Sequence, residues 1–556
     1  MTTVTNRWAG SGVAPGTVVA ASWRVDRPIP VSNRPISPVE VERAFRAVAA
    51  DLEQVAARAR EQGRTAVSDI VGVGALIAGD PDLVDAARRA AGTEDPLRGI
   101  QDAIEIYAVL LESLSDEMLR ERAADVRQVG RRVVDRLARS GAGVSAKPPA
   151  RRFVLVADEL GPADLLEHLG QGLVGAVAVR GGANSHAAIV ARSIGLPLVM
   201  GVDPRILDVT DHTPLLIDAN GGWVVTDPPH ADVVRAYAAS TRDEQRRTAL
   251  AAERGRPHLT ADGQPFTLLC NVASDTEVRA GRDAGATGVG LLRTELPFLD
   301  TGRWPTEADH RRSLRPILAE AAGWPVTVRL LDFANDKVPP FLRGHRVGLD
   351  ALLDNPTALS AQIRAVVDLG RGEPVQIMVP MVSTVAELRT VRAAVDTVTA
   401  ELRTAPVRVG AMVETVAAVE AIGALCEVAD FLSIGTNDLT AQVLDLDRTD
   451  PRARPELTAH PQVLDLIARV VTASCLAGVP VSVCGDAGSH PTTLPLLLGA
   501  GVRAVSVACA RIDEARYRLR RLDITRCADV FADALRACDA EAAAALVRDR
   551  IEVTVP

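Results

Sequence analysis

The sequence has few cysteines, and no two of them form a CxxC pair. Because they are odd in number, seven in all, and confined to the C-terminal half, neither a disulfide framework nor a zinc site is expected. This cysteine usage fits a reducing cytoplasm best. The positions are Cys270, Cys426, Cys475, Cys484, Cys509, Cys527 and Cys538.

The sequence also lacks a long basic run, a signal peptide and an apolar stretch long enough to span a bilayer. A formal net charge of -9 and a pI near 5.6 argue against a nucleic-acid partner, because such binders concentrate Lys and Arg. We therefore expect a soluble cytoplasmic protein without membrane insertion, whose partners are small anions or other proteins.

What the sequence does contain is enough apolar residues, 47% of 556, to bury several cores, which predicts two to four domains. A helical pattern runs from Ser37 to about Gly143, and it begins with a capping box formed by Ser37 and Glu40 around Pro38. This part predicts a helical bundle. The apolar stripe of its first helix is Val41, Phe45, Val48, Leu52 and Val55.

A second long helix is predicted from Asp116 to about Ala138. One of its faces is apolar, whereas the charged residues Arg122, Asp125 and Arg132 fall elsewhere. Acidic residues on such a face, here Asp125, are usually solvated. The apolar face comprises Leu119, Ala123, Val126, Val133 and Leu137.

Short apolar strands separated by helices occupy the segment from Arg151 to Asp227 and predict a small α/β unit. A charged stretch from His230 to Arg256 is expected to be a helical connector.

The C-terminal half alternates strand-like and helical runs with the regularity of a parallel sheet, which predicts an eightfold β/α barrel. The amphipathic stretches from Val385 to Leu402 and from Gln462 to Leu476 are examples of its helices. The eight predicted strands cover residues 266–272, 288–294, 326–333, 376–382, 407–414, 431–437, 479–485 and 504–510.

Polar residues gather where these strands end, and such a barrel builds its active site at the C-terminal ends of its strands. Glu414 and Asp438 are oxygen ligands suited to Mg²⁺, with substrate oxygens completing its coordination. Arg293, Arg329 and Arg448 provide guanidinium groups for a small anion. A single such residue more often forms a salt bridge at the rim or caps a strand end, but the convergence of several favours a binding site for Mg²⁺ and an anion. The remaining strand-end residues are Glu295, Asp332, Asp336, Lys337, Asn437 and Cys484.

Cys484 follows an apolar run and by default is a buried structural thiol, although its position at the barrel mouth would permit an acid or base role. His186 follows a Gly-Gly turn and Ser185 at the start of a predicted helix, where free N–H groups favour a phosphate. It is therefore a candidate phosphoryl carrier. A lone histidine in that place is more often a cap or a packing residue.

Taken together, these motifs resemble phosphoenolpyruvate-protein phosphotransferase, Enzyme I of the bacterial sugar phosphotransferase system, over essentially the whole chain. The motifs that carry the resemblance are GVAPG (12–16), ERAADVRQVGRRV (121–133), GGANSHAAIVARSIGLPLVMG (181–201), GVGLLRTEL (288–296), PTE (305–307), RLLDFANDK (329–337), VPM (379–381), GAMVET (410–415), SIGTNDLT (433–440), DR (447–448) and CGDAGSHP (484–491).

The resemblance implies that phosphoenolpyruvate phosphorylates His186 on Nε2 and that His186 passes the group to a histidine of the carrier HPr. It also implies that Glu414 and Asp438 hold Mg²⁺ and that Cys484 protonates the enolate to give pyruvate. Family members are commonly dimers through the barrel. The residues that the resemblance assigns to phosphoenolpyruvate are Arg293, Arg329, Arg346, Asn437, Asp438 and Arg448.

The expected architecture is a multidomain α/β protein with a C-terminal (β/α)8 barrel, a small swivelling α/β phosphohistidine domain and an inserted helical bundle. The phosphohistidine domain would comprise residues 1–35 and 144–228, and the bundle that docks HPr residues 36–143. A helical linker would follow at 229–256 and the phosphoenolpyruvate-binding barrel at 257–556.

The sequence departs from the family pattern at several positions. These departures bear on the orientation of His186 and on the rate of phosphoryl transfer, and they also admit a paralogue with a different HPr-like acceptor.

Two other functions remain open. A pyruvate phosphate dikinase or phosphoenolpyruvate synthase shares the histidine and the barrel but needs a large nucleotide-binding domain, for which the segment before Arg151 is too short and too helical. A regulatory protein could instead sense phosphoenolpyruvate without turnover. The departures are Leu165, Asn184, Ala334, Asn335, Leu349 and Ala441.

Overall fold

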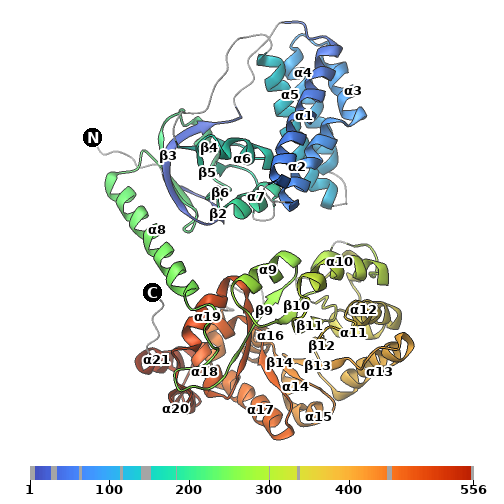
Figure 1. Cartoon of the computed structure of the whole chain (residues 1–556), viewed down its shortest axis with the longest axis vertical. Helices are drawn as coiled ribbons and strands as arrows, with labels where there is room; N and C mark the ends of the chain where they lie inside the picture. Colours follow the sequence, from blue (N-terminus) through green and yellow to red (C-terminus); the bar gives the residue numbers. More distant parts are fainter. Residues whose placement is uncertain are drawn as a thin grey trace. The chain divides into compact units, whose positions relative to one another are not determined.

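The structure is a computed structural model in which the chain divides into two compact units, Met1–Glu244 and Gln245–Pro556 (Figure 1). The structure describes residues 7–26, 34–61, 65–112, 117–139, 152–182, 185–299, 301–334, 338–446 and 454–551.

The first unit contains the predicted helical bundle. Its first helix begins as the capping box requires: the backbone N–H of Ser37 donates to Glu40 Oε2 (2.9 Å), and the N–H of Glu40 donates to Ser37 Oγ (3.3 Å). All members of the predicted stripe are fully buried except Val55, which is partly buried against the same core. The helices are α1 (Pro38–Glu61), α2 (Thr65–Ala78), α3 (Pro81–Ala90), α4 (Pro96–Glu112) and α5 (Glu117–Arg139).

Helix α5 corrects one expectation. The prediction that Asp125 is solvated is wrong, because α5 is buried on two faces rather than one. The side chain of Asp125 is only 6% exposed, and Arg132 pairs with Asp164 (2.9 Å) in the adjoining α/β part. The second face of α5 therefore packs polar groups against the α/β part.

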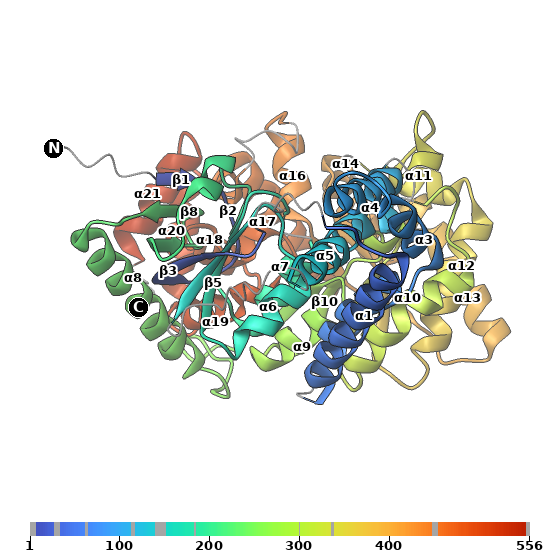
Figure 2. The ribbon, with the colours of Figure 1, turned by 90° about the horizontal axis from the view of Figure 1, so that it is seen from above.

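The α/β part of the first unit is one eight-stranded mixed sheet in the order β1-β8-β7-β3-β4-β5-β6-β2. Helices α6 (Pro162–Leu169) and α7 (His186–Ile194) lie between this sheet and the bundle (Figures 1 and 2). The strands are β1 (Arg7–Ala9), β2 (Ser11–Ala14), β3 (Thr17–Arg24), β4 (Phe153–Ala157), β5 (Leu173–Ala178), β6 (Leu198–Met200), β7 (Pro214–Asp218) and β8 (Trp223–Thr226), and a 3-10 turn, η1, covers Pro204–Asp208.

The predicted connector is the helix α8 (His230–Ala251). Near its end, Arg246 pairs with Glu514 (2.6 Å), and Arg254, just beyond it, pairs with Asp513 (2.5 Å). These two ion pairs attach the C-terminal end of the connector to a barrel helix.

The second unit is a closed barrel of eight parallel strands, which confirms the predicted fold and all eight predicted strands. Each strand pairs with the next in chain order, and the last, β16, pairs with the first, β9. The strands are β9 (Thr267–Val272), β10 (Val289–Leu292), β11 (Val326–Arg329), β12 (Val375–Val379), β13 (Arg408–Val413), β14 (Leu432–Ile434), β15 (Val481–Val483) and β16 (Ala504–Ala508).

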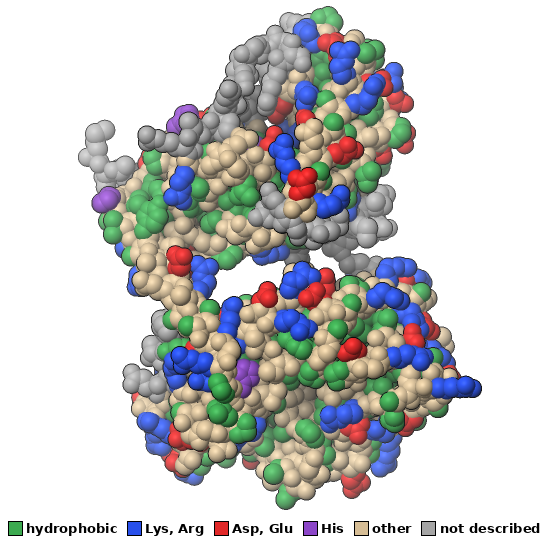
Figure 3. Space-filling view, in the orientation of Figure 1, with side chains coloured by type: hydrophobic (Ala, Val, Ile, Leu, Met, Phe, Trp, Pro, Cys, Tyr) green, Lys and Arg blue, Asp and Glu red, His purple; other side chains and the backbone are tan. Residues whose placement is uncertain are grey.

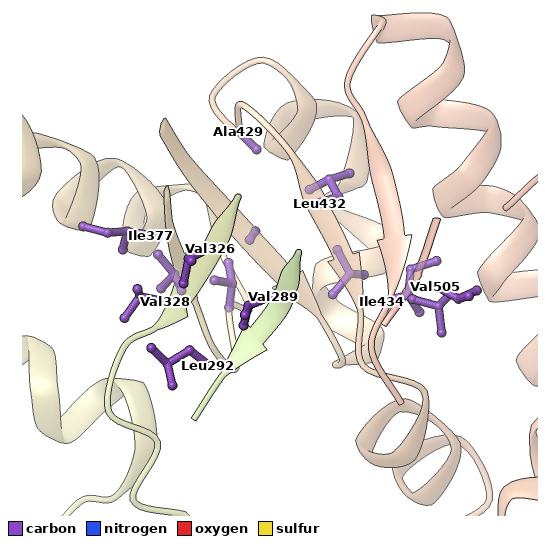
Figure 4. Close-up of a cluster of buried hydrophobic side chains, with 14 of the residues drawn as sticks. Val289, Leu292, Val326, Val328, Ile377, Ala429, Leu432, Ile434 and Val505 are labelled. Carbon is purple, nitrogen blue, oxygen red and sulfur yellow. The ribbon is translucent and has the colours of Figure 1, made fainter. Parts of the chain in front are cut away.

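Aliphatic side chains of these strands form one buried cluster with the surrounding helices, shown in part in Figure 4. The cluster holds the strands rigidly, so that residues at their ends have fixed positions. The helices are α9 (Asp275–Asp283), α10 (Glu307–Glu320), α11 (Gly348–Leu353), α12 (Pro356–Leu369), α13 (Val385–Leu402), α14 (Val416–Glu420), α15 (Ile422–Cys426), α16 (Thr436–Val443), α17 (Pro461–Ala477), α18 (Thr493–Gly499), α19 (Ile512–Leu519), α20 (Ile524–Ala534) and α21 (Ala540–Arg550). The 3-10 turns of this unit are η2 (Leu296–Phe298), η3 (Pro340–Leu342), η4 (Pro455–Ala459), η5 (Asp486–Ser489) and η6 (Cys509–Arg511).

Acidic and basic side chains are interspersed on the face of the barrel seen in Figure 3. None of the helices among the described residues is both long and apolar enough to cross a membrane.

Candidate active site

His186 is the first residue of α7, whose N-cap is Ser185. The Ser185 hydroxyl accepts the N–H of Ala188 (3.3 Å), and Gly195 ends the helix in a left-handed conformation (φ 67°). These caps fix a short helix whose N-terminus lies beside the imidazole. An anion next to His186 would meet free N–H groups and the positive end of the helix dipole.

The imidazole of His186 contacts a carboxylate of the bundle. Its Nδ1 lies 3.3 Å from Asp125 Oδ2, and Arg122 pairs with the same oxygen at 3.1 Å. Because a carboxylate can only accept, this contact favours the tautomer in which Nδ1 carries the proton and donates to Asp125, which leaves the Nε2 lone pair available for attack. The sequence pattern missed this residue. The polar residues Asp125, Gln128 and Arg131 or Arg132, spaced three to four apart, could have marked a second buried face of α5.

A cavity of about 200 Å³ lies beside His186. Two guanidinium groups line it, those of Arg127 and Arg180, together with Glu159. Arg180 pairs with Asp158 (2.5 Å) and lies 3.5 Å from Glu159. Arg127 pairs with Glu105 (2.8 Å). The two guanidinium groups could therefore bind a phosphoryl group on the imidazole only by exchanging or sharing these carboxylate partners.

In the barrel, the predicted site residues follow the ends of five strands. Arg293 follows β10, Arg329 ends β11, Glu414 follows β13 and Cys484 follows β15. Asn437 and Asp438 differ from the prediction: β14 already ends at Ile434, and both residues lie in the first turn of α16. The carboxyl ends of parallel barrel strands meet at one face, so these side chains share the barrel mouth.

Arg329 lies at the centre of a buried charge network. Its guanidinium pairs with Glu295 (2.6 Å) and Asp332 (2.9 Å), and all three side chains are at most 7% exposed. Burial opposes the charge of Arg329, but the two carboxylates and the nearby Glu414 more than offset burial and raise its pKa. The arginine is therefore held in one position, as recognition of a small anion requires.

Glu414 is almost completely buried, and its Oε1 accepts the backbone N–H of Met381 (2.7 Å). Burial, together with repulsion from Asp438 and Asp332, raises the pKa of Glu414 to about 8. A divalent cation between Glu414 and Asp438 would remove this repulsion, so the residues fit a metal. Among the residues that the structure describes, no group of three or more His, Cys, Asp or Glu side chains is arranged to hold a metal. Further ligands would have to come from substrate or water.

The charge on Glu414 makes stability depend on pH when no divalent metal is present. The folded state keeps the carboxyl proton up to pH 8, whereas the unfolded chain loses it near pH 4.5. Between these values the folded state binds more protons, so the free energy of unfolding should fall as pH rises, by at most about 1.4 kcal/mol per pH unit.

Urea unfolding of the EDTA-treated protein between pH 4.5 and 8 measures this dependence. In Glu414→Gln the slope should be shallower, and Mg²⁺ should flatten it in the original chain. An identical slope in both proteins would show that Glu414 is ionised without metal.

Cys484 is buried at the same mouth. Burial raises the pKa of its thiol to about 11, with Glu414 adding to the effect and Arg329 and Arg293 opposing it. Its backbone carbonyl accepts a hydrogen bond from Asn271 Nδ2 (3.0 Å), another residue that the sequence pattern missed. The thiol therefore carries its proton at neutral pH and can give it only to a group inside the mouth.

Asn437 is held at the rim of the mouth. Its Nδ2 donates to Asp486 Oδ2 (2.9 Å), and its Oδ1 accepts the backbone N–H of Asp486 (3.1 Å). A Cβ at Gly485 would lie 3.0 Å from Asn437 Oδ1, so the amide sits against the residue that follows Cys484.

Arg346 was predicted to bind the substrate at the barrel mouth, but its side chain pairs with other residues. Its guanidinium is 63% exposed and pairs with Asp350 (2.8 Å) and Asp354 (3.2 Å). The predicted residues Arg448, Asp336 and Lys337 and the departures Asn184 and Asn335 lie outside the described residues.

Three descriptions of one enzyme family match successive parts of the chain. They are the N-terminal domain (residues 9–122), the mobile domain (149–222) and the phosphoenolpyruvate-binding domain (247–524) of phosphoenolpyruvate-utilising enzymes. A phosphoenolpyruvate-protein phosphotransferase of Streptomyces coelicolor is 33% identical over 98% of both chains. One of Cupriavidus necator is 32% identical over 92% of both. The chain belongs to the phosphoenolpyruvate-protein phosphotransferase family.

Some relatives of this phosphotransferase family are longer. A multiphosphoryl transfer protein of Rhodobacter capsulatus is 37% identical over 74% of this chain. The chain spans about half the length of this relative and of a similar protein of Xanthomonas campestris.

Two departures from the phosphotransferase family pattern are buried aliphatic residues. Leu165 stands where the family pattern has a threonine whose hydroxyl contacts the active histidine. It packs in the core between the sheet, α6 and α7 and offers no hydroxyl to His186. Leu349 packs in the barrel core. The carboxylate of Asp125 lies 3.3 Å from Nδ1 of His186.

Proposed function

We propose that this protein transfers the phosphoryl group of phosphoenolpyruvate to His186 and from there to a histidine of HPr or an HPr-like carrier. One observation carries the proposal. Arg293, Arg329, Glu414 and Cys484 stand at the carboxyl ends of barrel strands, and Asp438 stands in the first turn of α16 after another strand. They are close enough that Asp438 and Arg329 shift the pKa of Glu414, and Glu414, Arg329 and Arg293 shift that of Cys484.

In the barrel, Arg329 and Arg293 would bind the phosphate and carboxylate of phosphoenolpyruvate, with Asn437 at the rim. Arg448 and Arg346 would add to this set in the bound state, which for Arg346 requires exchange of its present carboxylate partners. Glu414 and Asp438 would hold Mg²⁺, which when bound neutralises charge on the transferring phosphoryl group. Phosphoryl transfer depends chiefly on positioning and on charge neutralisation of this kind.

Cys484 would provide the proton for the second product. Loss of the phosphoryl group leaves the enolate of pyruvate, which needs a proton on C3. A thiol whose pKa is about 11 keeps its proton at pH 7 and lies beside Arg329, which would stabilise the enolate. Pyruvate would then leave the mouth.

His186 would attack with Nε2, because Asp125 accepts the proton on Nδ1 and orients the ring. Replacing Asp125 with Asn should slow phosphorylation about 10- to 100-fold. The amide can donate to Nδ1, which would place the ring proton on Nε2 and block attack.

The rate of label incorporation from phosphoenolpyruvate measures this effect. Asp51→Asn is the matched control, since Asp51 is an exposed carboxylate of α1 paired with Arg136. Its rate should be unchanged. An unchanged rate in Asp125→Asn would mean that Asp125 does not orient the imidazole.

The carrier would dock on the bundle. Helix α4 exposes three aliphatic side chains, Ile106, Val109 and Leu110, which are 50 to 71% exposed and spaced three and four residues apart. They form an apolar stripe on one face of the helix, and such stripes mark protein contacts.

Ile106→Glu should therefore lower the second-order rate of transfer to HPr by at least about tenfold, while phosphorylation of His186 stays unchanged. A matched control is Leu476→Glu, because Leu476 is an exposed leucine on barrel helix α17. Rapid-quench transfer from the phosphorylated enzyme measures the rate. An unchanged rate of transfer in Ile106→Glu would place docking elsewhere, and an equal loss in both variants would mean that the effect is not specific to α4.

The proposal includes the domain organisation expected from the sequence: residues 1–35 with 144–228, 36–143, 229–256 and 257–556. Movement of the phosphohistidine domain would bring His186 to each of its two partners in turn. A cytoplasmic location and a homodimer through the barrel complete the proposal.

Incubation with labelled phosphoenolpyruvate and Mg²⁺ tests the whole proposal. The expected results are an acid-labile label on the protein and release of pyruvate. Binding without label would favour a phosphoenolpyruvate sensor. Label from ATP but not from phosphoenolpyruvate would favour a dikinase.

A further inference from the structure

Two thiols lie together where the first and last strands of the barrel meet. Cys270 is on β9 and Cys509 directly follows β16, and in this strand pair Cys270 is opposite Val507. They are 239 positions apart in the sequence, so only the closure of the barrel brings them together.

The two sulfurs lie close together. Each thiol acts on the pKa of the other, which raises the pKa of Cys270 and lowers that of Cys509, while the thiol of Cys270 donates to the carbonyl oxygen of Gly288 (3.3 Å). The geometry agrees: a Cβ at Gly281 of α9 would lie 2.7 Å from the sulfur of Cys270 and 3.6 Å from that of Cys509. Because Gly281 has no side chain, both sulfurs fit into the space beside its backbone.

Their surroundings give the two thiols different roles. Cys509 is half-buried, so a small oxidant can reach it, and its sulfur also contacts the carbonyl oxygen of Glu277 (3.1 Å). Cys270 is fully buried, so it is shielded from a solvent oxidant. An accessible thiol of lowered pKa beside a second thiol is the arrangement of a peroxide-sensitive pair.

We propose that Cys270 and Cys509 are an oxidation site at which hydrogen peroxide closes a reversible disulfide between β9 and β16. The Cys509 thiol releases its proton and the thiolate attacks peroxide; an S–O bond forms, the O–O bond breaks, and the hydroxide that leaves takes up the released proton as water, so that Cys509 becomes a sulfenic acid. Cys270 then attacks that sulfur; the S–S bond forms, the S–O bond breaks, and the hydroxide that leaves takes the proton of Cys270 and becomes a second water. Two thiols are oxidised and one peroxide is reduced to two waters.

The cross-link would lie next to the barrel mouth. Asn271 follows Cys270 and donates to the carbonyl of Cys484, and Ser506 of β16 donates to Asn271 Oδ1 (2.6 Å). The disulfide would therefore join covalently two strands that are already connected through Asn271. Formation of the cross-link does not depend on the proposed function.

The test uses the full chain, reduced, freed of reductant and treated with hydrogen peroxide. After alkylation in denaturant and digestion without reductant, mass spectrometry should find one peptide pair joined through Cys270 and Cys509. The alkylatable thiols should fall by two per chain and return with dithiothreitol. Free, alkylated Cys270 after peroxide, or over-oxidised Cys509 without the cross-link, would overturn the proposal.

Two variants sharpen the test. Cys509→Ser should leave Cys270 reduced after the same treatment, whereas Cys475→Ser, which removes an exposed thiol of α17, should still form the cross-link. A cross-linked Cys270 in Cys509→Ser would overturn the pairing. The peptide map of the unaltered chain decides the matter even if a variant fails to fold.

Discussion

His186→Ala should abolish phosphorylation by phosphoenolpyruvate and leave phosphoenolpyruvate binding nearly unchanged. The imidazole is the proposed acceptor, and alanine has no lone pair with which to attack. Binding should persist because the charged groups at the barrel mouth, centred on Arg329 and Glu414, belong to the other unit and lie in a rigid core. Label incorporation measures the first effect, and calorimetric titration with Mg²⁺ and phosphoenolpyruvate measures the second.

The matched control for this variant is His230→Ala, since His230 is an exposed histidine at the start of α8. It should be labelled as fast as the original chain. Full labelling of His186→Ala would remove the histidine from the pathway. If His186→Ala loses both phosphoenolpyruvate binding and labelling, the substitution disturbs the barrel.

Asp438→Ala should lower Mg²⁺-dependent formation of pyruvate by at least about 100-fold with little loss of stability. Asp438 lies in the first turn of α16 and is one of only two carboxylates proposed to hold the metal. Its removal also takes away a negative charge that raises the pKa of Glu414, so that pKa should fall. A lower pKa favours the ionised form of Glu414, which is the form that binds a metal. The loss of activity would therefore follow from the missing Asp438 ligand and not from the changed ionisation of Glu414.

Pyruvate release at saturating Mg²⁺ measures the activity of Asp438→Ala, and urea unfolding measures its stability. The control is Asp465→Ala, an exposed aspartate of α17. Full activity in Asp438→Ala would exclude Asp438 from the metal site. Partial recovery at high Mg²⁺ concentration would agree with a weakened site that keeps Glu414.

The barrel could be predicted from the sequence because each strand is a short apolar run followed by an amphipathic helix, as in the segment that ends at Val413 and continues into α14. The carboxyl ends of parallel barrel strands meet at one face, so residues at these ends can be predicted to lie near one another even when the loop structures are unknown. For this reason Arg329 and Glu414 could be predicted to share one barrel mouth. Asn437 and Asp438 show the limit of this reasoning, since the strand before them is shorter than its apolar run suggests.

Contacts between distant segments could not be predicted in this way. Asp125 lies on a helix of the bundle and contacts His186 only because α5 packs its second face on the α/β part. Arg346 was placed in the site from its motif, but the structure pairs it with Asp350 and Asp354, the latter at the end of α11. Spacing along a helix identifies one face, whereas the contacts of a second face depend on tertiary packing.

The most direct measurement locates the phosphoryl group on the protein after reaction with phosphoenolpyruvate and Mg²⁺. Peptide mapping under alkaline conditions, which preserve phosphohistidine, should find one phosphorylated residue, His186, modified on Nε2, with one pyruvate released per chain. A phosphoryl group on any other residue, or pyruvate formed without a phosphorylated protein, would contradict the proposal that phosphoenolpyruvate bound at the barrel mouth phosphorylates the imidazole of His186.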